Sequence, residues 1–315
     1  MSEEKNTVTA EKTETEAAAV NEVPAKTEKA GKKKKEKEFR RLKSLSPMSV
    51  VIPFIMVNRT GSQNFIRDSF DIEKLEKYMK EKQREGMTNI SMMHIMIAAY
   101  IRLVSQRPAL NRFIRGQRIW TRKNVEVSLT IKKEMTLESP DTVVKITLPP
   151  DATLEEVYNA LNAEIVGYRD NPGGDFDNTA KVLTYLPGLL FKFTVATLRF
   201  LDYFNIMPKF IAKVSPFHCS YFITSMGSLG IPPIYHHLYD FGSCPVFFSF
   251  GAKRRVYELD AEGQVKKKSY LDFTFVLDER ICDGFYYASA LRLLKQIVKN
   301  PYQLDERPVV IPDIE

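Results

Sequence analysis

The sequence predicts an α/β fold of the α+β kind, with a sheet rich in pairs between strands that are distant in the chain. Runs with strand-like alternation and runs with helical periodicity are interspersed through most of the chain. Hydrophobic residues make up 44% and aromatic residues 11% of the 315 residues, which is ample for a packed core. Because no internal repeat divides the chain, we expect one domain over residues 47–315, preceded by a tail over residues 1–46.

The tail is rich in Glu, Lys, Thr and Ala and almost lacks aromatic residues. We expect it to be disordered, because it cannot bury enough apolar surface to offset the entropy lost on ordering. The run KKKKEKEFRRLK, residues 32–43, ends the tail. A solvated linker is the first interpretation, and a patch for acidic partners or anionic lipid is the alternative. The net charge of +7 does not indicate a nucleic-acid binder.

The first elements of the domain follow from pattern and end signals. Residues 49–59 are apolar and predict an extended segment, and residues 71–86 predict an amphipathic helix. A helix that is apolar almost all round should run from Ser91 to Pro108.

The next elements complete the predicted sheet and its cover. Alternation predicts strands at the positions listed here: 124–133, 142–150, 217–224, 245–251 and 267–277. A capping box from Thr153 to Glu156 predicts a helix, and NPGGDFDN, residues 171–178, predicts a loop. A hairpin turn is expected at Glu262 and Gly263, and a last helix over residues 284–301.

The most apolar region is Leu186–Val214, which Lys192, Arg199 and Asp202 interrupt and Pro208 breaks. No uncharged run reaches the roughly 18 residues that a spanning helix needs. We expect amphipathic helices packed on the core or on a neighbouring subunit, with peripheral membrane contact as the alternative.

Three cysteines, Cys219, Cys244 and Cys282, are too few and too scattered for a disulfide framework or a zinc cluster. The N-terminal stretch also lacks the apolar core of a signal peptide. We therefore expect a cytoplasmic protein without a metal.

The stretch LDERICDGF, residues 277–285, carries a motif: a strand, then Asp-x-Arg-x-x-Asp-Gly, then an amphipathic helix and Asn-Pro. This pattern resembles the end of the catalytic domain of the acyltransferase component of 2-oxoacid dehydrogenase complexes. Chloramphenicol acetyltransferase has a similar motif. Residues 90–133 are similar to the family's buried helix, Pro-x-Leu-Asn turn and strands, and residues 220–231 to its serine-containing strand and glycine turn. The resemblance covers roughly residues 47–302.

The resemblance implies a two-layer sandwich of the CoA-dependent acyltransferase type, with a mixed sheet covered by helices, and a definite mechanism. A histidine removes the proton of an acceptor thiol or hydroxyl, which attacks the thioester of acyl-CoA. A hydroxyl from a neighbouring subunit of a trimer binds the oxyanion. Carried over to this chain, the hydroxyl is Ser225 and the base position is Glu279. The motif aspartate, Asp283, would pair with Arg59, and Gly284 would let the chain turn.

Glutamate in place of histidine makes the activity an open question. A free carboxylate has a pKa of about 4.3 and a free imidazole about 6.5, so the substitution adds at most about 3 kcal/mol to proton removal. His236 and His237 are candidate substitute bases, whereas His94 and His218 are expected to be core residues. The chain is then an active acyltransferase, a pseudoenzyme that still binds CoA or an acyl chain, or an oligomeric scaffold.

No lipoyl-type domain is recognisable before residue 47, so no lipoyl group is expected on this chain. The acceptor would be a lipoyl group on a partner chain or a small molecule bearing a thiol, hydroxyl or amine. Cys282 is expected to be a small buried residue, with a reactive thiol as the alternative. The basic segment 252–270 is expected to be a solvated face, with contact to CoA phosphates as the alternative.

Overall fold

The computed structural model describes residues 38–132, 141–170 and 184–314. The strands are β1 (Phe39–Arg41), β2 (Gln63–Asp71), β3 (Arg112–Arg115), β4 (Arg118–Arg122), β5 (Val125–Lys132), β6 (Asp141–Leu148), β7 (Tyr221–Ser225), β8 (Val246–Leu259) and β9 (Val265–Asp278). The α-helices are α1 (Pro47–Ile55), α2 (Glu73–Arg84), α3 (Met92–Gln106), α4 (Leu154–Asp170), α6 (Gly188–Tyr203), α7 (Lys209–Val214) and α8 (Gly284–Lys299).

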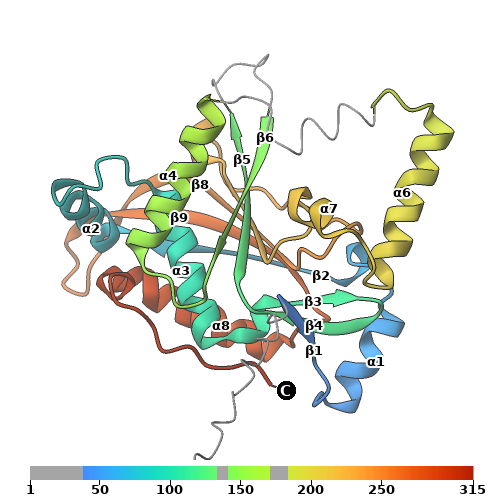
Figure 1. Cartoon of the computed structure of the whole chain (residues 1–315). Helices are drawn as coiled ribbons and strands as arrows, with labels where there is room; N and C mark the ends of the chain where they lie inside the picture. The colour runs from blue at the N-terminus through green and yellow to red at the C-terminus, as the bar shows by residue number, and fades with distance from the viewer. Residues whose placement is uncertain (1–37, 133–140, 171–183, 315) are drawn as a thin grey trace, which may run out of the picture. The chain divides into compact units, whose positions relative to one another are not determined.

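The strands form a large mixed sheet and a small antiparallel one (Figure 1). The large sheet has the order β2-β9-β8-β7-β5-β6. Strand β7 runs parallel to both of its neighbours, and the remaining pairs are antiparallel. The small sheet has the order β1-β4-β3. The predicted mixed sheet is confirmed.

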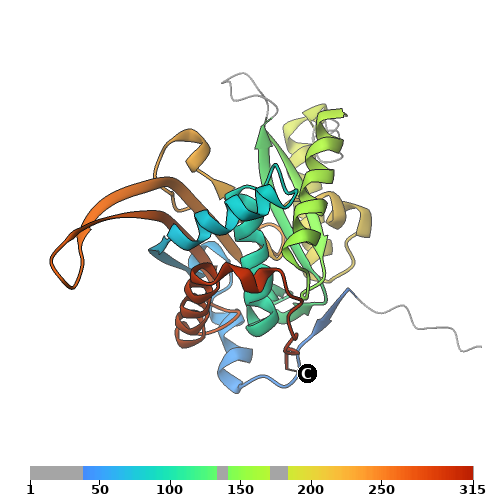
Figure 2. The ribbon, with the colours of Figure 1, turned by 90° about the vertical axis from the view of Figure 1, so that its left-hand side faces the viewer.

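Helices α2, α3, α4 and α8 cover one face of the large sheet, and the long β8–β9 hairpin extends beyond them (Figure 2). The core lies between these layers, where α3 is buried along most of its length. The ring of Tyr100 on α3 stacks on Tyr221 of β7, with 3.8 Å between centroids. This is the predicted two-layer arrangement, and burying such large aromatic side chains stabilises it.

Local signals in the sequence match the helix ends. Helix α3 begins after Ser91, whose side chain is bonded to His94 in a capping box, and ends two residues before Pro108. The backbone N–H of Thr153 donates to Glu156 over 2.9 Å, which is the predicted capping box of α4. The hairpin turns at Gly263, which has a positive φ of 74°. The predicted loop over residues 171–178 lies outside the described residues.

Two expectations near the start of the domain are wrong. Residues 47–55 form helix α1 rather than an extended segment, because Ser46 accepts a hydrogen bond from the backbone of Ser49 and Pro47 occupies the first helical turn. An unbroken apolar run cannot by itself distinguish the two. The folded region also begins before residue 47, since β1 pairs with β4 from Phe39 to Arg41.

Helices α6 and α7 form where the apolar region was expected to be helical, but neither contains a buried residue. Of the expected settings, packing on the core of the same chain is therefore not observed, and a neighbouring subunit or a membrane surface remains a prediction. Helix α6 attaches through its C-terminal end, where the hydroxyl of Tyr203 donates to Gln117 over 2.8 Å. Among the described residues, no helix combines the length and the apolar composition needed to cross a bilayer.

Candidate active site at the end of strand β9

Three segments that are distant in sequence meet where β9 ends: residues 59–63, 236–242 and 278–280. The backbone N–H of Glu279 donates to the carbonyl of Ser62 over 2.9 Å. The N–H of Leu238 donates to the side chain of Gln63 over 3.2 Å. Gln63 is in turn the strand partner of Asp278. The Glu279 position and the histidine-containing loop are thus held against one common segment.

Asp278 is the ionic centre of this junction, and its side chain is fully buried. Its carboxylate accepts from both Nε and Nη2 of Arg280 at 2.8 Å, a bidentate pair. It also accepts from Nε of Arg59 at 3.3 Å. Two guanidinium groups on one buried carboxylate fix the backbone on either side of Glu279.

The two arginines use their remaining donors on backbone carbonyls. Arg59 donates to Tyr239 at 2.5 Å and to Gly242 at 3.1 Å. Arg280 donates to Met56 at 3.0 Å and to Val57 at 3.2 Å. The same ion pairs therefore also hold the 236–242 loop and the end of α1.

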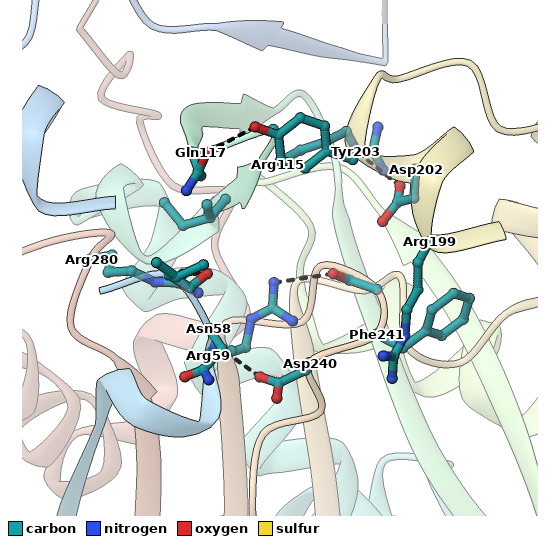
Figure 3. Close-up of a pocket in the computed structure, with 14 residues that line it drawn as sticks. Asn58, Arg59, Arg115, Gln117, Arg199, Asp202, Tyr203, Asp240, Phe241 and Arg280 are labelled. Atoms are coloured by element: carbon teal, nitrogen blue, oxygen red, sulfur yellow. Dashed lines mark hydrogen bonds and ion pairs between the residues drawn. The ribbon is translucent and has the colours of Figure 1, made fainter. Parts of the chain in front are cut away.

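A pocket of about 250 Å³ opens beside this centre (Figure 3). Arg59, Arg280 and Asp240 line one side, and Arg115 and the C-terminal end of α6 line the other. No cluster of three His, Cys, Asp or Glu side chains within the described residues could hold a metal ion.

Ion pairs satisfy most of the pocket's charges. Arg115 lies 3.0 Å from Asp202, and His218 lies 3.3 Å from the other carboxylate oxygen. Burial raises the pKa of Asp202, but the contacts with His218 and Arg115 outweigh it and leave the pKa lowered. For Asp240, burial likewise raises the pKa, and hydrogen bonds from Thr60 and Arg59 lower it further than burial raises it.

The carboxylate position and the candidate substitute bases share this region. Glu279 is exposed, directly after the buried Asp278. His237 is also exposed and contacts the ring of Tyr239 edge-on. His236 is half-buried and stacks on Phe247 at 4.4 Å, and burial followed by the charge of His237 lowers its pKa. Of the expected bases, Glu279 and His237 are therefore the accessible ones.

Ser225 lies elsewhere in the same chain. It ends β7 at the level of Phe250, which pairs with Phe273 of β9. From Phe273 to Asp278 the strand runs about 17 Å, at about 3.3 Å per residue. One chain therefore does not bring Ser225 to Glu279.

The expected pairing of Asp283 with Arg59 is wrong. Asp283 is exposed and caps helix α8, accepting from the backbone N–H of Tyr286 at 2.8 Å. Arg59 is directed to Asp278 instead, because a buried guanidinium is stabilised best by a buried carboxylate. Gly284 begins α8 without a positive φ, and a Cβ there would meet nothing within 4 Å, so the expected need for glycine does not arise in the single chain.

Sequence reasoning assigned no role to Asp278, Arg280 or Asp240. The first two stand in the Asp-x-Arg part of the motif, directly on either side of Glu279. The sequence did contain a signal for them, because Asp278 and Arg280 form a pair of opposite charges at the end of an apolar strand. Charges that are buried there need partners.

Searches with the sequence find no matching protein-family model and no matching curated protein. Solved structures do match. A probable dihydrolipoamide acetyltransferase from Listeria monocytogenes has a TM-score of 0.52 at 13% identity, with 82% of this chain and 94% of that chain covered. The dihydrolipoamide acetyltransferase of Azotobacter vinelandii, studied for the catalytic roles of a serine, a histidine and an asparagine, has a TM-score of 0.52 at 14% identity, with 83% and 93% covered.

The cubic core of a pyruvate dehydrogenase multienzyme complex has a TM-score of 0.50 at 14% identity, with 83% of this chain and 93% of that chain covered. At these identities the likeness concerns the fold. The chain therefore has the fold of the dihydrolipoamide acetyltransferases, as the resemblance predicted.

Proposed function

We propose that this protein is a CoA-dependent acyltransferase whose site is completed between two copies of the chain. The observation that supports this most is the separation of Ser225 from Glu279 within a fold shared with dihydrolipoamide acetyltransferases. Ser225 lies at the level of Phe273, about 17 Å along β9 from the strand end that leads into Glu279, so one copy would supply the base and another the oxyanion hydroxyl.

At the base end, Glu279 removes the proton of the acceptor, which attacks the acyl carbon. As the C–S bond then breaks, the proton held on Glu279 passes to the leaving sulfur, and CoA is released as the thiol. The buried Asp278 and its two arginines hold the Glu279 backbone in place. A carboxylate is the weaker base by about two pKa units, which slows proton removal from a thiol without preventing it. His237, on the loop that contacts the same segment, is the alternative base.

In the second copy, Ser225 at the end of β7 would donate its hydroxyl to the oxyanion of the tetrahedral intermediate. The β8–β9 hairpin starts next to it and carries a row of cations. Several of these are paired with carboxylates, for example Lys253 with Glu76 and Lys268 with Glu258. Arg255 and Lys267 carry no ion pair in the described part of the chain, and the register places them on one face of the hairpin. This pair is suited to a phosphate of CoA.

A second copy has a suitable contact surface on α1. Its exposed side chains include Met48, Val51, Phe54 and Ile55, and the helix carries no charge. An apolar, uncharged and exposed helix is typical of an obligate subunit interface. A homotrimer, which the resemblance implies, would cover this surface. It would also bring Glu279 of one copy to Ser225 of another.

The acceptor is a lipoyl group carried by a partner chain, or a small thiol, hydroxyl or amine. All three cysteines are free, which supports a reducing compartment such as the cytoplasm. The second candidate function is a pseudoenzyme that binds CoA or an acyl chain without transfer. The specific observation that favours it is the carboxylate at the base position.

The test is release of CoA thiol from a panel of acyl-CoAs, with dihydrolipoamide and simple amines and alcohols as acceptors. The native protein should turn over, and Glu279→Gln and Ser225→Ala should each lower kcat by roughly 100-fold or more. Glu279→His should raise the rate by about tenfold, since part of the difference in base strength enters the barrier. A silent native protein that also stays silent as Glu279→His would overturn catalysis. A silent native protein that becomes active as Glu279→His would establish the pseudoenzyme.

A further inference from the structure

Helix α6 has several large apolar side chains on the face that points away from the protein. The residues that are half-buried are Thr194, Val195, Leu198, Leu201 and Asp202. At about 100° per residue these positions fall on one side of the helix. This inner side includes the polar side chains of Thr194 and Asp202. A helix that covers a core normally turns its most apolar face inward.

The opposite side of α6 carries Leu189, Phe193 and Phe200, which are 86%, 69% and 60% exposed. Their spacing places them within about one quarter of the helix circumference. Phe204, at the end of the helix, extends this exposed set. We call these four side chains the outer apolar stripe. Bulky aromatic and leucine side chains grouped in this way mark a surface that something else covers.

Cations flank the outer apolar stripe. Lys192 and Arg199 are seven residues apart and therefore share a helix side beside the stripe, and both are exposed. Lys209 and Lys213 share a side of α7 and are also exposed. The one acidic residue between 184 and 214 is Asp202, whose carboxylate already lies 3.0 Å from the guanidinium of Arg115. The surface is therefore apolar and cationic together.

We propose that the outer apolar stripe and its flanking cations bind the surface of a bilayer that contains anionic lipid. The helix would lie in the plane of the interface, with the leucine and phenylalanine side chains among the acyl chains and the cations at the lipid phosphates. This inference does not depend on catalysis at Glu279.

Charge favours a bilayer over a second copy that presents the same surface. Two copies meeting face to face through this surface would bring Lys192, Arg199, Lys209 and Lys213 together without carboxylates to receive them. The exposed face of α1, by contrast, is uncharged and suits a copy of the chain. Anionic headgroups supply the missing negative charge, and long lysine and arginine side chains can reach them while their stems cover apolar surface.

The experiment is vesicle flotation of the full chain with phosphatidylcholine vesicles, with and without phosphatidylglycerol. The native protein should float with the anionic vesicles, and added salt should weaken this binding. Replacing two stripe residues, Phe193→Ser with Phe200→Ser, should lower the partition coefficient by roughly tenfold or more. Lys209→Ala with Lys213→Ala should lower binding to the anionic vesicles by several-fold.

The matched control is Tyr257→Ser with Leu259→Ser, because these side chains are as exposed but lie on the β8–β9 hairpin. This variant should float like the native protein. Native protein that ignores anionic vesicles would overturn the proposal. So would undiminished flotation of the Phe193 and Phe200 variant, which would assign binding to the basic run at residues 32–43. A loss of oligomer mass in that variant, without vesicle binding by the native protein, would assign the stripe to a second copy.

Discussion

Asp278 and Arg59 form an ion pair in which the two side chains are 0% and 4% exposed, with 3.3 Å between the carboxylate and the guanidinium Nε. The pair joins the end of β9 to the segment before β2 and, through the carbonyls of Tyr239 and Gly242, to the histidine-containing loop. The geometry around Glu279 therefore depends on one buried charge cluster and not on the motif aspartate Asp283.

Substitution of Asp278, the carboxylate of this cluster, should lower the stability of the protein strongly. Asp278→Asn leaves two buried guanidinium groups without a charge partner and should lower the free energy of unfolding by about 3–5 kcal/mol. The control is Asp272→Asn, whose partner Arg254 is half exposed, and it should cost about 0–1 kcal/mol. Urea denaturation measures both, and equal losses would contradict the assignment of Asp278.

Two glycines of the site should respond in opposite ways to alanine. Gly242 has a φ of 88°, and a Cβ there would lie 2.3 Å from the carbonyl oxygen of Phe217. Gly242→Ala should therefore cost at least about 2 kcal/mol of stability.

Gly284→Ala meets open space at a helical φ and should be neutral or stabilising by up to about 1 kcal/mol. Thermal unfolding compares the two variants. A destabilising Gly284→Ala would mean that the turn before α8 needs glycine after all.

Stability should fall as the pH drops below about 6.5. Burial lowers the pKa of His218 and outweighs the opposing contact with Asp202, and burial also lowers the pKa of His94. With a folded pKa below the unfolded value, the unfolded state binds more protons between the two. The stabilisation is thus fully present above the unfolded pKa and is lost as the pH falls toward the folded one.

The measurement is the urea midpoint of the native protein and of His218→Gln from about pH 7 to about pH 5. The native midpoint should decline, and the variant should decline less steeply, whatever its stability at neutral pH. Parallel declines would show that His218 does not contribute to the pH dependence.

Cys282 should be inert to thiol reagents despite standing inside the motif. Burial raises its pKa to about 12. At pH 8 its thiolate fraction is then on the order of one in ten thousand, which makes alkylation slow. Mass spectrometry after iodoacetamide treatment should find Cys282 unmodified in the native state and modified in urea. Rapid labelling of the native protein would revive the reactive-thiol alternative.

The sequence predicted those helices whose apolar pattern and end signals favour the same structure as their packing in the fold. Helix α3 has an unbroken apolar pattern between Ser91 and Pro108, and α4 has its capping box, so propensity and packing point the same way. The stretch that became α1 is equally apolar but has no periodicity, and its helical state depends on the Ser46 cap. Pattern reasoning had no means of weighing that cap against an extended run.

The site was only partly predictable for a different reason. The resemblance placed Ser225 and Glu279 through short motifs, which report positions in the chain but not partners in space. The partner of Arg59 is decided by burial, and Asp278 is buried where Asp283 is exposed. Likewise, nothing in the apolar pattern of residues 188–203 says which face of α6 is covered, because that depends on how its C-terminal end is attached.

The most direct test of the shared site mixes two inactive chains. Glu279→Gln and Ser225→Ala would be co-expressed with different tags, and oligomers carrying both tags purified and assayed for acyl transfer. If each site takes Glu279 from one copy and Ser225 from another, one of the three sites in every mixed trimer receives both intact residues, so the purified mixed oligomers should recover about a third of native activity. Mixed oligomers that stay as inactive as either variant alone would contradict a site completed between copies.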